Sequence, residues 1–505
     1  MFTNNRSKSK GTAKRSHIAS EDRAVSAATK DNVEYVQQAL YQTGDLENRP
    51  IVCSAGQGCL LYLDSVCDPD KIHEFILKPL FAAGEDDPMS VITSSDVQKH
   101  TDLERAIDLM LEGYSVLHFE GGRECYVVRV PSVNNRAVEE PMNEKAIQGA
   151  HNGFIESMNV NLQLIRKQIG SRNLVVRRYR LGKMTKSDAS IVYLNDLADP
   201  KLVDEIDRKI KAIDADNLMN AYMILEYVEN QSFSPFPQIL QTERPDRTIG
   251  NLLEGRIAFL MEGTPTALIV PVSFFVFYQS PDDYNSRTLA GTFIRLLRLF
   301  SFFIAIMLPA YYIAVVSFHY EVIPKEVFYQ IKGSVAKIPY PPILEALFME
   351  LAIELLREAG MRLPAPIGQS IGIVGGLVIG DAVVRVGLVS YPMIIVVALT
   401  AIASFVVPSH EMSYSVRLLR FPLMLSAAFL GFQGIVFSLM AILVHLCILE
   451  SFGRPYFAPL APMRLKDWKD SLMRLPFWML NERPMESHSQ KLIQESNRQK
   501  GGAKR

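Results

Sequence analysis

Cysteine is scarce in this sequence, and its scarcity limits the chemistry that the chain can carry. Five cysteines occur in 505 residues, with no Cys-x-x-Cys pair. Cys53, Cys59, Cys67 and His73 fall within a short span, but their separations match none of the common zinc patterns. We therefore expect reduced thiols in the core or at the surface, no metal site and no other cofactor.

An excess of basic residues is also missing. The chain has 53 Lys and Arg residues against 54 Asp and Glu residues, which gives a formal net charge of −1. A protein that binds nucleic acid usually carries a clear basic excess. The balance of charge therefore argues against nucleic acid as the main partner.

Common catalytic motifs are lacking as well. The best phosphate-loop candidate is Gly182-Lys183, but Met184 follows where Ser or Thr is required, and no Gly stands five residues upstream. There is no His-Glu-x-x-His run, and no Gly-x-Gly-x-x-Gly follows a strand-like segment. We predict that the chain is not an enzyme.

What the chain does have is a long apolar region. The mean hydropathy is +0.09, because apolar runs dominate residues 299–449 whereas residues 1–290 have the composition of a charged globular protein. The first 20 residues are basic without an apolar core, so we do not expect a secretory signal. The sequence predicts an α/β two-lobed soluble N-terminal domain followed by an all-α multipass transmembrane domain.

Composition divides the chain into five parts. Both ends are rich in Ser, Lys and Gln and nearly free of large apolar side chains, which is typical of disorder. The predicted parts are a disordered basic tail (1–30), a first α/β lobe (31–140), a second α/β lobe (141–290), a transmembrane helical domain (291–450), and a cytoplasmic tail (451–505) that is disordered from about residue 484.

The two predicted lobes share a short repeat. The segments LEGYSVLHFEGG (111–122) and LEGRIAFLMEGT (253–264) both contain Leu-Glu-Gly, six further residues, and Glu-Gly. Each segment ends a helical pattern at Gly, continues through an apolar strand and reaches a turn. The agreement in spacing and pattern favours two related lobes.

Four segments are candidates for membrane spans, since about 20 apolar residues cross a bilayer. They are 299–318 with Pro309 as a kink, 366–389, 391–408 and 423–449. Basic residues flank the first and the last of these segments. The positive-inside rule then places both termini in the cytoplasm and requires an even number of crossings.

A further helix, predicted over residues 341–360, carries charges on one side of its helical wheel. These charges are Glu350, Glu354, Arg357 and Glu358. An interfacial helix that faces both lipid and water explains them. Glu345 falls on the opposite, apolar side, and we expect it to be buried in the assembly. Whether this helix spans the membrane stays open, and the topology depends on the answer.

Glycine is concentrated in the segment 366–389. Four glycines recur at steps of four residues and a fifth stands beside them: Gly368, Gly372, Gly376 and Gly380, with Gly375. In lipid the helix forms despite their poor propensity, and small residues on one face let another helix approach closely. One interpretation is packing within the monomer. The other is a helix repeated around an axis between identical subunits, where glycine leaves room for a narrow pathway.

Asp381 and Arg385 stand one helical turn apart near the end of this segment. The two side chains can pair with each other. Repeated around an axis, Asp381 would instead form a carboxylate ring of the kind that cation channels use. Both hypotheses stay open at this stage.

Five blocks of sequence occur together between about residues 90 and 460. They are GFIESMNVNLQLIRKQI (153–169), SPFPQILQTERPD (234–246), LLEGRIAFLMEGTPTALIVP (252–271), ELLREAGMRLPAPIGQSIGIVGGLVIGDAVV (354–384) and ALTAIASFVVPS (398–409). In combination they resemble the A subunit of the GerA-type spore germinant receptors. The resemblance implies a multipass subunit of the inner spore membrane of an endospore former, with a two-lobed soluble domain.

The resemblance also implies partners and a role. Such a subunit works with a transporter-like B subunit and a lipoprotein C subunit, and it oligomerises around a membrane pathway. The complex senses nutrients and commits a dormant spore to germinate through early ion release.

A signature segment follows from the same resemblance: Pro237, Glu243, Arg244, Pro245 and Asp246. Its prolines stiffen the chain, and its charged residues can form a salt-bridged loop. The segment is either a structural junction between the soluble lobes or a contact that transmits the state of the ligand to the membrane helices.

Three functions compete. The first is a ligand-gated, cation-conducting subunit, and the second is a non-conducting scaffold of the same receptor. The third, a secondary transporter, is disfavoured because the spans are few and show no inverted repeat. Copies of the same chain and membrane lipid are the remaining expected partners.

Overall fold

The computed structural model describes residues 23–54, 56–82, 88–132, 140–141, 143–144, 148–336, 338–364, 367–368, 376 and 380–494. The chain forms two compact units. The first unit runs to Asn135 and includes Arg166–Val175, and the second comprises Arg136–Ile165 and Val176–Arg505. The first unit holds one α/β lobe, here called lobe 1. The second unit holds most of lobe 2, a helical region and the C-terminal segment; the end of α6 and the start of β6, described below, belong to the first unit.

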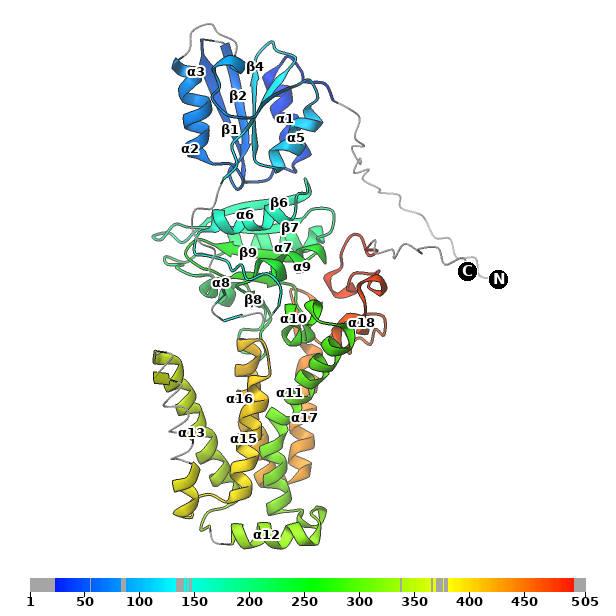
Figure 1. Cartoon of the computed structure of the whole chain (residues 1–505). Coiled ribbons are helices and arrows are strands. Elements are labelled where there is room, and N and C mark those ends of the chain that lie inside the picture. Colours follow the sequence, from blue (N-terminus) through cyan, green and yellow to red (C-terminus); the bar gives the residue numbers. More distant parts are fainter. Residues whose placement is uncertain are drawn as a thin grey trace, which may run out of the picture. The chain divides into compact units, whose positions relative to one another are not determined.

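Lobe 1 is a five-stranded sheet with helices on both faces. Its elements are α1 (Thr29–Ala39), β1 (Leu46–Cys53), β2 (Gly56–Leu63), α2 (Pro69–Ile72), the π-helix η1 (His73–Leu77), α3 (Lys78–Ala82), α4 (Pro88–Val91), β3 (Val97–His100), α5 (Leu103–Leu111), β4 (Tyr114–Phe119) and β5 (Cys125–Arg129). The strand order is β1-β2-β4-β5-β3, with antiparallel neighbours. Three consecutive residues of β2, Cys59 to Leu61, are all buried, so both faces of the sheet are covered. Figure 1 shows α2 and α3 on one side and α1 and α5 on the other.

Lobe 2 repeats this arrangement. Its elements are α6 (Met158–Gln168), β6 (Leu174–Leu181), β7 (Ser187–Leu194), α7 (Pro200–Lys211), α8 (Ala221–Val228), β8 (Leu240–Thr242), α9 (Pro245–Leu253), β9 (Ile257–Met261) and β10 (Ala267–Val270), followed by the 3-10 helix η2 (Phe274–Tyr278) and α10 (Pro281–Asn285). The strand order is β6-β7-β9-β10-β8. In chain order this is the order of lobe 1, so the predicted relation between the lobes is confirmed.

The sequence repeat lies at equivalent turns of the two sheets. Gly113 ends α5 before β4, and Gly255 ends α9 before β9; both have φ of +93°. Gly121 and Gly263 follow the same strands with φ of +84° and +81°. Side chains rarely adopt these angles, which is why glycine occurs at all four turns.

Both lobes also contain a buried asparagine that forms the same pair of hydrogen bonds with the backbone. Asn32 of α1 accepts a hydrogen bond from the Ser26 backbone N–H (2.9 Å) and donates to the Ser26 carbonyl (2.7 Å). Asn161 of α6 forms the same two bonds with Ile155, at 2.9 and 2.6 Å. Each asparagine thereby ties the start of its helix to the preceding chain, where the backbone groups would otherwise be unpaired.

The N-terminus of each of these helices also meets a carboxylate. The Thr29 N–H donates to Glu120 at 2.9 Å, and the Met158 N–H donates to Glu262 at 2.8 Å. These glutamates are the ones that follow the repeated strands β4 and β9. A carboxylate at this position is favoured by the partial positive charge of the helix start.

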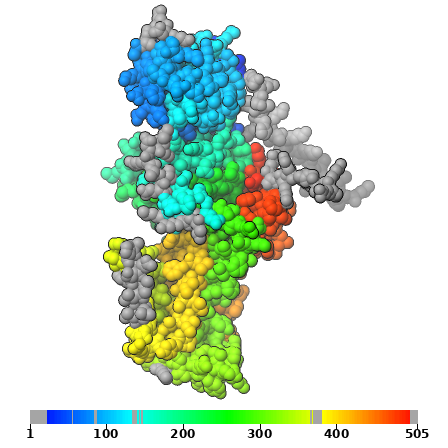
Figure 2. Space-filling view, viewed as in Figure 1, coloured from blue at the N-terminus to red at the C-terminus, as the bar shows by residue number. Residues whose placement is uncertain are grey.

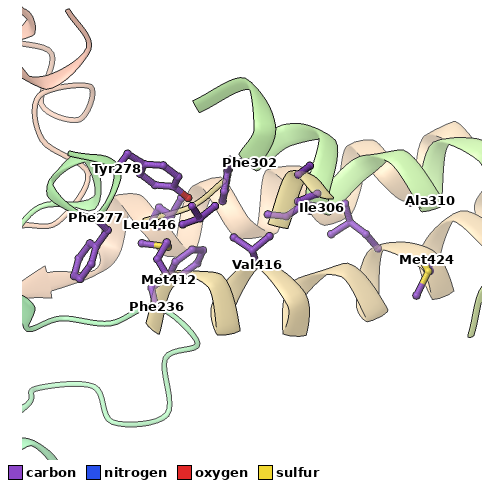
Figure 3. Close-up of a cluster of buried hydrophobic side chains, with 14 of the residues drawn as sticks. Phe236, Phe277, Tyr278, Phe302, Ile306, Ala310, Met412, Val416, Met424 and Leu446 are labelled. Carbon is purple, nitrogen blue, oxygen red and sulfur yellow. The ribbon is translucent and has the colours of Figure 1, made fainter. Parts of the chain in front are cut away.

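The helical region follows lobe 2. Its elements are α11 (Thr288–Ser317), the 3-10 helix η3 (Tyr320–Val322), α12 (Lys325–Val335), α13 (Pro342–Arg362), α15 (Tyr391–Phe405), α16 (His410–Leu430) and α17 (Phe432–Ile448). Within the described part of the chain, α11 alone is long and apolar enough to cross a membrane, while α15 and α17 are shorter apolar helices. Figure 3 shows apolar side chains of α11, α16 and α17 meeting Phe236, Phe277 and Tyr278 of lobe 2 in one continuous core.

The span predicted over residues 423–449 is wrong as a single helix. Gly431 has φ of +61° and separates α16 from α17. A methyl group placed on Gly431 would lie 2.9 Å from the His319 side chain. The unbroken apolar run therefore conceals a turn, because hydropathy does not detect a glycine that is required by backbone angle and close packing.

The C-terminal segment packs on the same unit. Its elements are β11 (Glu450–Ser451), β12 (Arg454–Pro455), α18 (Trp468–Ser471) and the 3-10 helices η4 (Phe477–Met479) and η5 (Met485–Ser487). The sequence predicts disorder from about residue 484, but residues 484–494 are described and make hydrogen bonds with lobe 2. Hydrogen bonds of backbone and side-chain groups, rather than buried apolar side chains, hold these residues in place. For that reason their polar composition resembles that of a disordered tail.

Candidate functional site

A seam of polar side chains runs between the helices of the apolar region. It is formed by Tyr312 of α11, by Glu345, Glu350, Glu354 and Arg357 of α13, by Ser390 and Ser404 at α15, and by Arg417 and Arg420 of α16. Ionisable residues inside apolar helices mark functional sites more often than they mark stability alone. We call this set the polar seam.

Glu350 and Arg420 form the most deeply buried ion pair of the seam. Their side chains are 4% and 5% exposed. The Nε of Arg420 also donates to the Ala305 carbonyl of α11 at 2.9 Å. Pro309 lies four residues further along α11 and has no N–H to offer that carbonyl. Arg420 therefore satisfies the group that the proline leaves without its helical partner.

A second pair lies beside the first. Arg417 of α16 binds Glu354 of α13. Arg357, one turn along α13, donates to the Ser404 hydroxyl of α15 at 3.0 Å. Glu354 and Arg357 lie 3.7 Å apart, so the seam connects three helices through charged groups.

The interpretation of these α13 charges as a water-facing side is wrong for Glu350 and Arg357, whose side chains are 4% and 12% exposed and face other helices. Glu354 binds Arg417 but its side chain is 41% exposed, and Glu358 pairs with Arg362 at the surface (2.6 Å). The physical reason is the presence of partners on α16. A helical wheel of one segment cannot show that arginines of another segment neutralise its charged side.

Glu345 is 1% exposed and lies apart from the arginines. One of its carboxylate oxygens accepts the Ser390 N–H at the start of α15, at 2.9 Å. The Ser390 hydroxyl lies 3.3 Å from that of Tyr312. The other oxygen of Glu345 is buried without a hydrogen-bond partner among the described residues.

The glycine segment is described only in part. Gly372 and Gly375 lie outside the described residues. A methyl group on Gly368 would lie 2.8 Å from the Gly360 carbonyl, whereas no described residue comes within 4 Å of a methyl group on Gly376 or Gly380. Asp381 and Arg385 form an exposed ion pair at 2.8 Å, which is the first of the two arrangements considered for them.

Residues 234–236, directly before Pro237 of the signature segment, contact the apolar helices. The Ser234 hydroxyl lies 2.8 Å from Nε2 of His445 in α17, and the Ser415 hydroxyl of α16 donates to the Pro235 carbonyl. Phe236 is 2% exposed and stacks on His445, with ring centres 6.0 Å apart. Pro237 follows directly and is half-buried. Residues 234–236 thus touch α16 and α17.

The remaining residues of the signature segment lie inside lobe 2. Arg244 is 2% exposed and forms a two-bond ion pair with Asp246, at 2.7 and 3.0 Å. Pro245 is the first residue of α9. Glu243 accepts the Asn143 N–H at 3.1 Å. These contacts fix the start of α9, which precedes the repeated strand β9.

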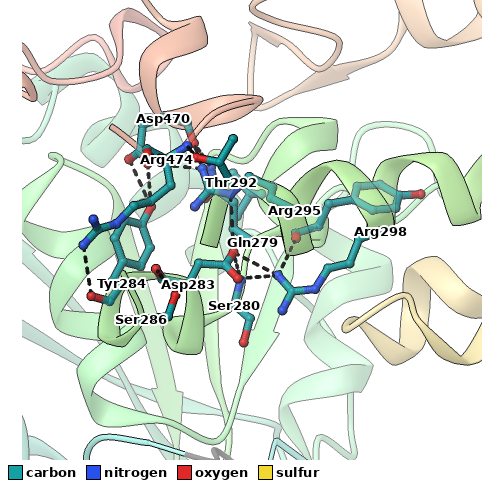
Figure 4. Close-up of polar contacts among 12 residues, drawn as sticks. Gln279, Ser280, Asp283, Tyr284, Ser286, Thr292, Arg295, Arg298, Asp470 and Arg474 are labelled. Carbon is teal, nitrogen blue, oxygen red and sulfur yellow. Dashed lines mark hydrogen bonds and ion pairs between the residues drawn. The ribbon is translucent and has the colours of Figure 1, made fainter. Parts of the chain in front are cut away.

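A second charged network joins α10, α11 and the C-terminal segment (Figure 4). Asp283 is 1% exposed and binds Arg298 at 2.7 Å and Arg295 at 3.3 Å. The Tyr284 hydroxyl donates to Asp470 at 2.9 Å, and Arg474 donates to the Tyr284 carbonyl at 3.1 Å. Arg295 and Arg298 are among the basic residues that flank the first predicted span, and the sequence gives them no further role. Their spacing of three residues on a helix could have indicated a shared partner.

A cavity of about 480 Å³ lies beside this network. Residues of α9, α10 and the C-terminal segment line it, among them Arg247, Glu254, Tyr284, Asp467 and Asp470. Burial raises the pKa of Glu254 to about 7, although Arg256 at 3.2 Å opposes the shift. The volume is in the range of small-molecule pockets.

Three of the four cysteines of lobe 1, Cys59, Cys67 and Cys125, belong to its core, and Cys53 is half-buried. Cys59 and Cys67 are 3% and 1% exposed, and burial raises the pKa of the Cys59 thiol to about 11. Among the residues that the structure describes, no three His, Cys, Asp or Glu side chains are grouped so that they could hold a metal ion.

Comparison with known proteins identifies similar chains over nearly the whole length. The family model described as Bacillus/Clostridium GerA spore germination protein matches residues 34–486. Uncharacterized membrane protein YfkQ of Bacillus subtilis (strain 168) is 36% identical over 92% of both chains. Spore germination protein KA of the same organism is 37% identical over 84% of this chain and 80% of its own. Spore germination protein GerLA of Bacillus cereus is 35% identical over 89% and 93%.

One solved structure is also similar. It is the crystal structure of the N-terminal domain of the A subunit of the Bacillus megaterium spore germinant receptor GerK3. It covers 50% of this chain and 98% of its own length, with 24% identity and a TM-score of 0.38.

Proposed function

The chain belongs to the Bacillus/Clostridium GerA family of spore germination proteins, and we propose that it is the A subunit of a nutrient-sensing germinant receptor. In this proposal several copies surround a pathway in the inner spore membrane and conduct cations when a nutrient binds the complex. A transporter-like B subunit and a lipoprotein C subunit are its partners, and both termini lie in the cytoplasm. The subunit is not an enzyme.

The observation that carries the membrane part of the proposal is the inverted distribution of polar side chains in α13, α15 and α16. The Glu350–Arg420 pair is inside, and so is Arg417, while large apolar side chains of the same helices are exposed. Leu418, Leu425 and Phe429 of α16 are 60%, 45% and 77% exposed, while Arg420 is 4% exposed. This distribution suits lipid as the solvent, because buried charges need partners and exposed apolar groups then cost nothing.

Signal transfer is proposed to pass through two contacts between lobe 2 and the helices. One is the Ser234–Pro237 segment against α16 and α17, and the other is the network around Asp283. Either contact links the state of lobe 2 to the position of α11, α16 and α17. A nutrient can open the assembly only through different affinity for the two states, whatever its total affinity.

Conduction is proposed to use the glycine segment. Gly376 and Gly380 have no heavy atom of the described residues within 4 Å of an added methyl group, which leaves room on that side for a helix of another subunit. Small residues there permit such an approach, and Asp381 would then recur around the axis. The alternative function is a non-conducting scaffold. The 2.8 Å pairing of Asp381 with Arg385 favours it, because a neutralised carboxylate attracts cations less.

The test is potassium release from liposomes that contain this chain with its partner subunits, before and after addition of a nutrient panel. Gly376→Leu is the probe, and Gly333→Leu in α12 is the control, since Gly333 is an exposed helical glycine with equally open space. Conduction predicts that Gly376→Leu changes nutrient-triggered release while the complex still assembles. A scaffold predicts that release and assembly are lost together, or that the assembled complex releases nothing.

A further inference from the structure

In lobe 1 the residues that follow β5 pack against the turn at Gly113. There the Ser132 N–H donates a hydrogen bond to the Val66 carbonyl at 2.8 Å. A methyl group on Gly113 would lie 3.1 Å from Cβ of Pro131 and 3.3 Å from the Val66 carbonyl oxygen. Residues 130–132 therefore fill the groove between the α5–β4 turn and the loop after β2.

Lobe 2 has the same groove but a different occupant. After β10 the chain leaves for η2 and the helical region, so it cannot fill the groove itself. The Gln490 N–H instead donates to the Leu197 carbonyl at 2.8 Å. A methyl group on Gly255 would lie 3.0 Å from the Leu197 oxygen and 3.1 Å from Cβ of Ser489. Leu197 and Gly255 of lobe 2 are the counterparts of Val66 and Gly113 of lobe 1.

The occupant is a closed loop, residues 481–494, here called the C-terminal loop. Glu482 and Ile493 form an antiparallel bridge at its base. The Arg483 N–H donates to the Leu492 carbonyl at 2.7 Å, and the Gln494 N–H donates to the Asn481 carbonyl at 2.8 Å. A loop whose ends are tied together can leave or enter a groove as one body.

The tip of the C-terminal loop is held by polar contacts. Glu486 lies 3.0 Å from both Arg256 and the Ser273 hydroxyl. The side-chain amide of Gln490 donates to the Asn195 and Ala198 carbonyls at 3.0 and 2.5 Å. Figure 2 shows the red C-terminal segment seated on the green surface of lobe 2.

The burial of the loop is small. Among the described residues 481–494, Ser487 and Ser489 are buried, while Leu492 and Ile493 are 44% and 73% exposed. Segments with few buried apolar contacts open at a free energy well below that of global unfolding. The chain segment 130–132 of lobe 1 is different, because it continues directly from a core strand and Val130 is fully buried.

We propose that the groove of lobe 2 is a docking surface for the chain's own C-terminal loop, and that the loop undocks as a unit while the lobe stays folded. Undocking removes one of the links between lobe 2 and the C-terminal segment, which also binds α10 and α11 through Asp470 and Arg474. The Arg454–Asp199 pair and the hydrogen bond from Ser451 to the Gln238 carbonyl stay in place. Undocking also opens one wall of the 480 Å³ cavity, which Asn481, Glu482 and Pro484 form. The inference concerns a movement within one chain and holds whether or not the assembly conducts.

The experiment is amide hydrogen exchange of the full chain in detergent, followed by mass spectrometry of peptides. We expect the C-terminal loop to exchange at least about tenfold faster than β9. In a chain that ends at Leu480, residues 195–198 and 253–256 should exchange about tenfold faster than in the full chain, while the Gly113 turn of lobe 1 is unchanged. A synthetic peptide of residues 481–494 should restore the slow exchange.

A second variant keeps the test decisive if the shortened chain does not fold. Ser489→Trp in the full chain places a large side chain against Gly255 and should release the loop with the rest of unit 2 intact. Loop amides that exchange as slowly as β9 would contradict the proposal. Unchanged exchange at residues 195–198 and 253–256 in a folded chain without the docked loop would contradict it equally.

Discussion

Lobe 1 and lobe 2 are built on one plan and differ in how the plan is completed. Both have the strand order of the repeat, a glycine with φ of +93° before the fourth strand, and a buried asparagine at the first helix. In lobe 1 the residues that close the fold follow the last strand directly. In lobe 2 they come more than 200 residues later, from the C-terminal loop.

The helical region is inserted between the last strand of lobe 2 and the residues that close this lobe. Residues 271–480 stand between the last strand of lobe 2 and the segment that closes it. A loop at this position can be extended at small entropic cost, because closure entropy grows only with the logarithm of loop length. The α/β module can therefore carry the helical region without any change in its sheet.

The largest effect on stability is expected from a buried ion pair that has no counterpart in lobe 2. Asp45 precedes β1 and forms an ion pair at 2.7 Å with Arg166, which lies near the end of α6 and belongs to unit 1; both side chains are essentially unexposed. The equivalent residue before β6 is Asn173. Asp45→Asn leaves the guanidinium buried without its partner and should lower the stability of unit 1 by about 3–5 kcal/mol.

The measurement for Asp45→Asn is hydrogen exchange of β2 and β4 in the full chain as a function of denaturant. Glu34→Gln is the control, because Glu34 belongs to an exposed pair with Lys30 at 4.0 Å. Equal stability of Asp45→Asn and Glu34→Gln would mean that the buried pair adds nothing to lobe 1.

The repeated asparagines allow the same change in both lobes. Asn32→Ala and Asn161→Ala each remove the partner of one backbone N–H and one carbonyl, so each should cost its own lobe about 2–4 kcal/mol. Exchange rates measured separately for lobe 1 and lobe 2 peptides check this. The control is Gln37→Ala, because Gln37 is an exposed residue of α1. If one asparagine substitution destabilised both lobes, the two lobes would not be independent in stability.

The glycine turns before β4 and β9 allow the same substitution at equivalent positions of the two lobes. Gly113→Ala and Gly255→Ala force a side chain into a strained φ and against a neighbour, at a cost of about 1–3 kcal/mol each. The neighbour of Gly255 belongs to the detachable C-terminal loop, so Gly255→Ala should also speed exchange of residues 481–494. Gly263→Ala, where the φ is similar and the space open, is the control for backbone strain alone.

The smallest effect concerns pH. Hydrogen bonds from Thr29 lower the pKa of Glu120 in the folded lobe. The stabilisation is therefore fully present above the ordinary pKa of a glutamate and is lost as the pH falls through the lowered value. Glu120→Gln should abolish this part of the acid sensitivity of lobe 1, measured by exchange at the start of α1. Identical acid profiles for Glu120→Gln and the unchanged protein would show that the carboxylate has no such role.

The sequence was informative wherever a local pattern had a local cause. The repeat at 111–122 and 253–264 predicted equivalent strands and turns, because glycine at these angles is required by the backbone alone. The apolar run of α11 was recognised because hydropathy and length suffice for such a helix. The turn at Gly431 was missed because its cause is the approach of His319, which is distant in sequence.

The candidate site shows the same limit. Glu345 stood out as a carboxylate on an apolar side, but the partners of Glu350 and Glu354 lie on another helix. The role of Arg420 depends on a proline of α11, and neither residue suggests the other in the sequence. Charges that are neutralised across helices cannot be assigned from one segment.

The amino-acid sequence alone was enough to recognise the family, the two related α/β lobes and the apolar helical region. These follow from composition, periodicity and short motifs, which act over a few residues. Only the tertiary structure decided that arginines of α16 neutralise the charges of α13, and that the C-terminal loop closes lobe 2. Both depend on contacts between segments far apart in the chain, whose free energy arises when folding brings them out of water together.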